Sequence, residues 1–119
     1  MRILVVEDNP DGREALRDLL ELWGYEVDVA EDGARGVQLA RSRRPRVALV
    51  DIGLPEMDGY EVARQVRAGA DGALPYLVAI TGYGQPEDRD RALAAGFQSH
   101  LVKPVDPADL AQVLRDIDP

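Results

Sequence analysis

The chain has 119 residues, of which 45% are hydrophobic and 30% are charged, and its formal net charge is −8. We expect residues 1–119 to form a single domain, because this length suits one hydrophobic core. The acidic excess argues against direct binding of nucleic acid, since phosphate backbones attract clustered Lys and Arg. No cysteine is present, which excludes disulfides and thiolate metal sites.

The sequence predicts no targeting segment and no membrane segment. Its first apolar stretch meets Glu7 and Asp8 too soon to be a signal peptide. No apolar run approaches the roughly 20 residues that span a bilayer. We therefore expect a soluble, cytoplasmic protein without membrane partners.

Short apolar runs alternate with longer amphipathic stretches along the whole chain. The runs predict strands near residues 2–6, 25–29, 46–51, 75–80 and 98–102. The third and fourth runs are continuously apolar, which is typical of a parallel sheet that is buried on both faces.

The amphipathic stretches predict five helices between and after these strands. Cap residues or a glycine mark the starts of four of them: Asn9, Gly33, Asp58 and Asp106. The remaining helix, near 86–95, offers little apolar surface and should be weakly held. Trp23 continues the apolar face of the first helix, so we expect it in the core.

This order of elements predicts an α/β fold with a doubly wound, five-stranded parallel sheet. Crossovers in such sheets are right-handed, so the carboxyl ends of all strands lie at one edge. Ligands bind at that edge, at the point where the strand order reverses. If the order is 2-1-3-4-5, the first and third strands are neighbours at that point.

Polar groups able to do chemistry follow four of the predicted strands. Glu7 and Asp8 follow the first, Asp51 ends the third, Thr81 follows the fourth, and Lys103, the only lysine, follows the fifth. Each has an ordinary explanation when taken alone: acids favour helix N-termini, and the lone lysine can reflect an arginine-biased composition. The order 2-1-3-4-5 would nevertheless bring the three acids to one crevice flanked by the hydroxyl and the ammonium.

This combination predicts a metal site next to a nucleophile. Three neighbouring carboxylates repel one another unless a cation joins them, and a site with only oxygen ligands suits Mg²⁺. A strand-end aspartate such as Asp51 can then attack phosphorus to give an aspartyl phosphate. Lys103 would neutralise charge on the phosphoryl oxygens, and the hydroxyl of Thr81 would donate to one of them.

Four segments resemble the motifs of the receiver domains of two-component response regulators, and the resemblance covers the whole chain. They are residues 3–8, 51–59, 79–82 and 101–104. The resemblance implies a flavodoxin-like (βα)5 fold in which Asp51 is the phosphoacceptor. The donor would be the histidine of a histidine kinase or of a histidine phosphotransfer protein. It also implies a cis bond before Pro104, and that Asp8, Asp51 and the backbone carbonyl of Gly53 bind Mg²⁺, with Glu7 acting through water.

The resemblance further implies a switch. Phosphorylation would change the face formed by the fourth helix, last strand and last helix, where a downstream protein binds. His100 stands where the family usually has Tyr or Phe, and two interpretations stay open: it swings inward with Thr81, or it is an ordinary strand residue. Gly53 and Tyr83 occupy positions that tune hydrolysis of the phosphoryl group in the family. We expect this protein to be a phosphoacceptor and not an enzyme, with autophosphatase activity at most.

Other functions can be weighed against the same residues. A flavodoxin-type FMN carrier would need a Ser/Thr/Gly-rich phosphate-binding loop after the first strand. This chain has residues 7–10 there, whose acids Glu7 and Asp8 would repel a phosphate in the absence of a metal. An aspartyl-phosphate phosphatase would need an acid where Gly53 stands. A phosphate-independent interaction module of the same fold stays open. We expect no output domain in this chain, which is either a standalone regulator or a receiver of a hybrid histidine kinase, the kind that residues 81–84 and 100–105 resemble.

Overall fold

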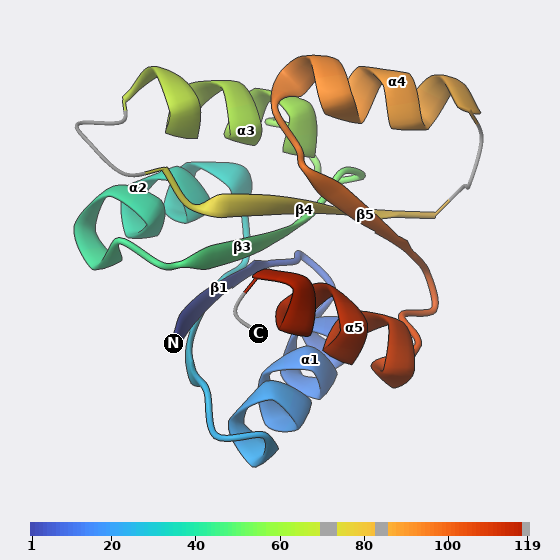
Figure 1. The fold of residues 1–119 in the computed structure, drawn as a ribbon. Coiled ribbons are helices and arrows are strands. Elements are labelled where there is room, and N and C mark those ends of the chain that lie inside the picture. Colours follow the sequence, from blue (N-terminus) through green and yellow to red (C-terminus); the bar gives the residue numbers. More distant parts are fainter. Residues whose placement is uncertain (70–73, 83–85, 118–119) are drawn as a thin grey trace.

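The computed structural model describes residues 1–69, 74–82 and 86–117, which fold into three layers (Figure 1). The central layer is one sheet of five parallel strands in the order β2-β1-β3-β4-β5. The strands are β1 (Arg2–Val6), β2 (Glu26–Ala30), β3 (Val47–Asp51), β4 (Tyr76–Thr81) and β5 (Ser99–Val102). The helices are α1 (Pro10–Leu22), α2 (Gly33–Arg43), α3 (Gly59–Ala68), α4 (Pro86–Ala95) and α5 (Pro107–Ile117). The predicted fold class and strand order are therefore confirmed.

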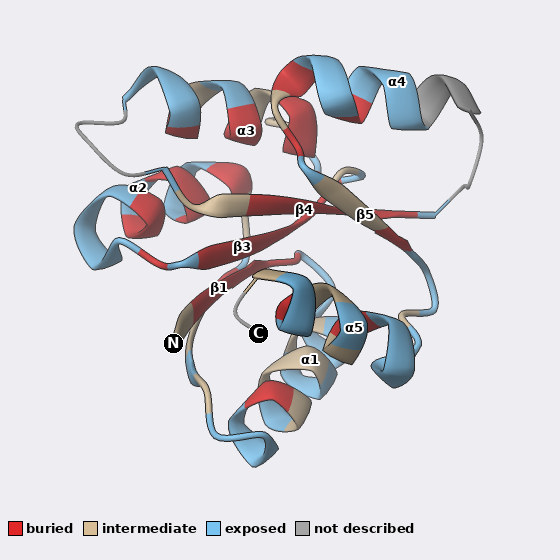
Figure 2. Ribbon diagram, viewed as in Figure 1, coloured by how far each residue is buried: buried red, intermediate tan, exposed pale blue. Residues whose placement is uncertain are grey.

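The sheet is covered on both faces. Helices α2, α3 and α4 lie on one face, and α1 and α5 lie on the other (Figure 1). Successive side chains of a strand point to opposite faces, so Leu4 and Val6 join one core while Ile3 and Val5 join the other. Buried residues accordingly concentrate in the strands and on the sheet-facing sides of the helices (Figure 2).

Capping side chains fix where the helices begin. The Asn9 side chain accepts hydrogen bonds from the amides of Asp11 (2.9 Å) and Gly12 (3.2 Å), as the sequence predicted. Asp58 caps α3 in the same way, with its carboxylate 2.9 Å from the Glu61 amide. The α2 helix begins at Gly33 itself, and its N-cap is the preceding aspartate.

Burial decides one expectation about an apolar residue and bears on a second, that α4 is weakly held, which stays a prediction. The prediction that Trp23 belongs to the core was wrong: it is 37% exposed. It is the C-cap of α1, where the chain leaves the helix towards Gly24 (φ 92°), so it no longer follows the helical face. In α4, Ala92 and Ala95 are buried while Leu93 is 59% exposed, so the described part of this helix contributes small side chains to the core.

No helix in the described part of the chain combines the length and the apolar character needed to cross a bilayer.

Candidate functional site

The acidic residues of the site emerge from two adjacent strands. β1 and β3 pair in parallel, with Val6 opposite Val50, so Glu7 and Asp51 leave the sheet next to each other. The Glu7 amide still donates to the Ala30 carbonyl (3.0 Å), which ties this residue to β2. The predicted convergence at the strand-order reversal is therefore present.

Lys103 follows β5 and reaches back to both carboxyl groups. Its Nζ lies 2.8 Å from Asp51 Oδ2 and 3.4 Å from Glu7 Oε1. The other oxygen of Asp51, Oδ1, accepts a hydrogen bond from the Gly53 amide at 2.9 Å. Asp51 is only 4% exposed, so its carboxylate is fixed between these two donors at the floor of the site.

These groups line a hollow of about 380 Å³ at the carboxyl edge of the sheet. Six of the site residues predicted from sequence border it: Glu7, Asp8, Asp51, Gly53, Thr81 and Lys103. Thr81 is the last residue of β4 and is 6% exposed. The predicted nucleophile, acids, hydroxyl and ammonium thus share one hollow.

Tyr60 also lines the hollow, although the sequence analysis did not select it. It is 4% exposed and belongs to the first turn of α3. The Arg91 guanidinium carbon lies 4.2 Å from the centre of its ring, a cation–π contact that joins α3 to α4. A buried aromatic near a helix start is most simply a core residue, so no sequence signal distinguishes this one.

The electrostatics of the site differ between its two buried acids. Burial raises the pKa of Glu7 to about 7, and hydrogen bonding and charge repulsion from Asp51 add to this rise against the opposing effect of Lys103. Burial also acts to raise the pKa of Asp51, but hydrogen bonds with Glu7, Lys103 and the Gly53 amide outweigh it and lower that pKa below its ordinary value. Asp51 is therefore the carboxylate that stays ionised.

The pKa of Lys103 shifts in the direction that keeps it charged. Burial alone would lower this pKa, but the hydrogen bond to Asp51 and the negative charges of Asp51 and Glu7 raise it above its ordinary value. An ammonium thus remains beside the ionised Asp51.

The donor set fits a hard divalent cation. Ligand atoms of Glu7, Asp8 and Asp51 all lie within 4.8 Å of one another. The buried Oε2 of Glu7 has no hydrogen-bond partner within the described ranges, so it is available to a cation or to its water. Asp8 is exposed at the mouth, and all candidate ligand atoms are oxygens, the type that Mg²⁺ prefers.

We expect replacement of Glu7 by glutamine to stabilise the metal-free protein at pH 8 by about 1–3 kcal/mol, since one pKa unit is worth about 1.4 kcal/mol. The pKa of Glu7 is about 7 in the folded state against 4.5 ordinarily, so ionised Glu7 disfavours folding. The full penalty applies above pH 7, shrinks as the pH falls, and is absent below pH 4.5. Urea unfolding in EDTA at pH 8, 6 and 4.5 measures this trend. A gain in stability that is equal at every pH would contradict this explanation. The matched control is Glu21→Gln, because Glu21 is an exposed acid that pairs with Arg17.

The start of α3 packs directly against the loop that follows Asp51. A Cβ on Gly59 would lie 2.6 Å from the carbonyl oxygen of Asp51 and 2.6 Å from the Cα of Ile52. The Gly59 amide also donates to the Ile52 carbonyl at 3.0 Å. Close approach of two backbones therefore requires glycine here.

We expect Gly59→Ala to lower the free energy of unfolding by about 1–3 kcal/mol, because two backbone segments must separate. Urea or thermal unfolding followed by circular dichroism measures the loss. Gly12→Ala in α1 is the matched control, since its Cβ would meet nothing nearer than 3.6 Å and should leave stability equal or slightly higher. Equal effects of the two substitutions would contradict the packing argument.

Comparison with known proteins decides the family. The family model described as "Response regulator receiver domain" matches residues 3–115. The chain belongs to this family. Its fold and its place in two-component signalling follow from that membership.

Related receivers cover nearly the whole chain. The structure of the receiver domain of sensor histidine kinase PA1611 from Pseudomonas aeruginosa PAO1 is 34% identical with a TM-score of 0.89, and the match covers 99% of this chain and 98% of that one. It holds a magnesium ion coordinated in its active site cleft. Chemotaxis protein CheY4 of Vibrio cholerae is 29% identical with a TM-score of 0.91, over 98% and 97% of the two chains. Response regulator MprA of Mycobacterium avium is 41% identical over 104 residues, 87% of this receiver but only 45% of that regulator.

Three further residues that the family resemblance singled out can now be located in the receiver. The Lys103–Pro104 peptide bond is cis, as the resemblance implied. His100 lies on β5 opposite Ala79, outside the acidic hollow, with its Nε2 3.4 Å from a guanidinium nitrogen of Arg89. It borders a groove shared with residues of α4 and α5, so it belongs to the α4-β5-α5 face, and its role as a switch stays a prediction. Tyr83 lies outside the described residues.

Proposed function

We propose that this receiver is a phosphoacceptor and that Asp51 takes a phosphoryl group from the histidine of a histidine kinase or of a histidine phosphotransfer protein. The observation that carries the proposal is the Asp51 carboxylate, ionised and fixed between Lys103 Nζ (2.8 Å) and the Gly53 amide (2.9 Å) at the floor of the hollow. A pre-positioned carboxylate with an adjacent cation is what an attack on phosphorus requires.

In the transfer, an Asp51 carboxylate oxygen forms a bond to phosphorus as the bond from phosphorus to the donor's imidazole nitrogen breaks. Lys103 moves from the carboxylate to a phosphoryl oxygen, and the Thr81 hydroxyl donates to another. Asp8, Asp51 and the backbone carbonyl of Gly53 would hold Mg²⁺, with Glu7 acting through water, and the bound ion would offset the negative charge of the phosphoryl group. Hydrolysis of its own phosphoryl group is the only enzymatic activity that we propose, with Gly53 and Tyr83 tuning its rate.

The proposal is tested by incubating the protein with acetyl phosphate and recording its intact mass with and without Mg²⁺. We expect one added phosphoryl group that depends on Mg²⁺. Rapid hydrolysis could remove an adduct, so binding of beryllofluoride, a phosphoryl mimic, is measured in parallel by NMR. Neither an adduct nor beryllofluoride binding would contradict the proposal and favour a phosphate-independent interaction module.

We further propose that phosphorylation changes the α4-β5-α5 face and thereby the binding of a downstream protein. Thr81 connects the two regions, because it ends β4 in the hollow and its carbonyl accepts from the Lys103 amide (2.7 Å) just beyond β5. In ¹⁵N NMR spectra, beryllofluoride with Mg²⁺ should shift amides of residues 89–102 as well as those around Asp51. Shifts confined to the hollow would contradict this switch.

A further inference from the structure

The loop between β1 and α1 carries two of the three acids of the site, and one residue of α1 holds its backbone. Arg13 Nη1 lies 3.1 Å from the carbonyl oxygen of Glu7 and 3.4 Å from that of Asp8. The backbone amide of Arg13 also donates to the carbonyl of Asn9 at 2.9 Å. Three consecutive carbonyl oxygens, those of residues 7–9, therefore accept hydrogen bonds from a single residue.

The contacts of Arg13 differ from those of Arg17, one turn later in the same helix. The Arg17 guanidinium pairs with the carboxylates of Glu21 (2.9 Å) and Glu14 (3.7 Å), which lie four and three residues away. No acid stands three or four residues from Arg13, so no ion pair along the helix competes for its guanidinium. The partly buried Arg13 side chain instead turns back to the main chain of the loop.

The direction of the Asp8 side chain depends on this backbone. Within residues 1–69, 74–82 and 86–117, no hydrogen bond or ion pair holds the exposed Asp8 carboxylate, whereas Lys103 and the Gly53 amide hold Asp51. The two carbonyls that Arg13 Nη1 contacts belong to the peptide units on either side of the Asp8 Cα. Because peptide units are planar, holding both of them fixes the backbone dihedral angles of Asp8 and thus the direction of its Cβ. A ligand oxygen of Asp8 accordingly lies within 4.8 Å of those of the other two acids.

We propose that Arg13 is a positioning residue for the metal site, which directs the Asp8 carboxylate towards the cation by fixing the backbone on both sides of Asp8. The inference rests on the metal site of the proposed function. Groups that orient metal ligands raise metal affinity without touching the ion. The charge of the guanidinium acts in the opposite direction, because it repels a divalent cation. Positioning and charge therefore predict opposite effects when the guanidinium is removed.

The proposal is tested by titrating the ¹⁵N,¹³C-labelled full chain with Mg²⁺, without a phosphodonor, and following the NMR signals of Glu7, Asp8 and Gly53. Arg13→Met keeps the apolar stem but removes the donors, and we expect it to bind Mg²⁺ about 10-fold more weakly than the wild type. Arg13→Lys keeps the charge on a shorter, more flexible side chain, so its affinity should lie between the two. In the metal-free Arg13→Met protein, the carbonyl ¹³C signals of Glu7 and Asp8 should move upfield, because they lose a hydrogen bond.

Arg17→Met is the matched control, because it removes the same charge from α1 and should change neither the Mg²⁺ affinity nor the two carbonyl signals. Unchanged or tighter Mg²⁺ binding by Arg13→Met, equal weakening by Arg17→Met, or no Mg²⁺ binding by the wild type would overturn the proposal. If Arg13→Met does not fold, weaker binding by Arg13→Lys supports the proposal and unchanged binding overturns it. A protein that binds Mg²⁺ in this way but takes up no phosphoryl group would contradict the proposed phosphoacceptor function alone.

Discussion

Replacing Asp51 with asparagine is expected to reduce phosphoryl incorporation from acetyl phosphate by at least about 100-fold, to below detection by intact mass. The asparagine side chain has nearly the same shape as aspartate, and its oxygen can still accept a hydrogen bond from the backbone amide of Gly53. In the wild-type protein this backbone nitrogen lies 2.9 Å from Asp51 Oδ1. It has no carboxylate oxygen able to attack phosphorus, and it removes the ionised ligand at the centre of the site. The loss should therefore be chemical and should not reflect unfolding.

Asp58→Asn is the matched control for this substitution. Asp58 lies on the same loop but caps α3 through the Glu61 amide, and asparagine caps helices equally well. This variant should be phosphorylated like the wild type. An Asp51→Asn protein that still gains one phosphoryl group at the wild-type rate would show that another residue is the acceptor.

Replacing Lys103 with methionine is expected to slow phosphorylation by about 10- to 100-fold, the size of one lost hydrogen bond to a charged group. Methionine preserves much of the apolar stem but removes the ammonium that contacts Asp51 Oδ2 at 2.8 Å and Glu7 Oε1 at 3.4 Å. Time courses with acetyl phosphate, read by intact mass, measure the rate. Lys103→Arg should recover only part of it, because a broad guanidinium cannot occupy the place of a compact ammonium.

Lys103→Met should have a smaller effect on the free energy of unfolding than on the rate of phosphorylation. Two buried carboxyl groups lose their partner, yet the Lys103 side chain is 40% exposed, so water screens the interaction and the loss should be about 1–2 kcal/mol. Arg115→Met removes one positive charge from α5 and should change neither quantity. A Lys103→Met protein with the wild-type phosphorylation rate would contradict the assigned role of the ammonium.

Most of the site could be predicted because its reactive side chains lie at the ends of strands. The positions of Glu7, Asp51, Thr81 and Lys103 after apolar runs, combined with parallel topology, predict that they meet, and the structure places them around one hollow. The long-range step needed only the strand order 2-1-3-4-5, which the sequence analysis took as its condition and which the sheet has.

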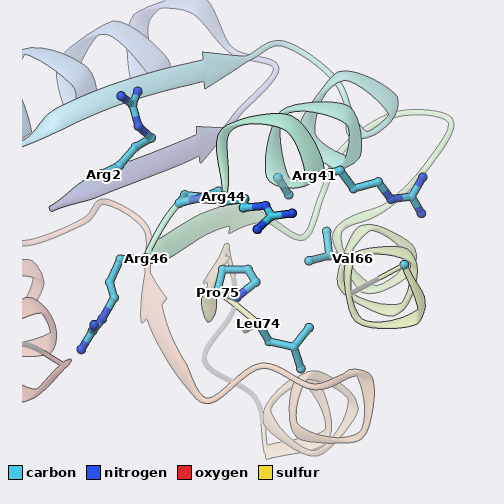
Figure 3. A pocket seen from close by; sticks show the side chains of 10 residues that line it. Arg2, Arg41, Arg44, Arg46, Val66, Leu74 and Pro75 are labelled. Carbon is cyan, nitrogen blue, oxygen red and sulfur yellow. The ribbon is translucent and has the colours of Figure 1, made fainter. Parts of the chain in front are cut away.

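Other features could not be read from the sequence because they depend on tertiary geometry. Trp23 fits the helical apolar pattern, but the helix ends one residue before it. Tyr60 has the sequence signature of a core residue, and only its position beside the loop after Asp51 makes it a wall of the site. Arg44 ends α2 in the left-handed conformation, and its side chain extends towards Val66 (Figure 3), and both features appear only in three dimensions.

The central claim, that Asp51 accepts the phosphoryl group, is tested most directly by locating the modified residue. Borohydride reduces an aspartyl phosphate to homoserine, so the protein is treated with acetyl phosphate and Mg²⁺, reduced, digested and sequenced by mass spectrometry. We predict homoserine at position 51 and unmodified residues at positions 7 and 8. Homoserine at position 8, or a reduced side chain at position 7 with Asp51 intact, would contradict the account.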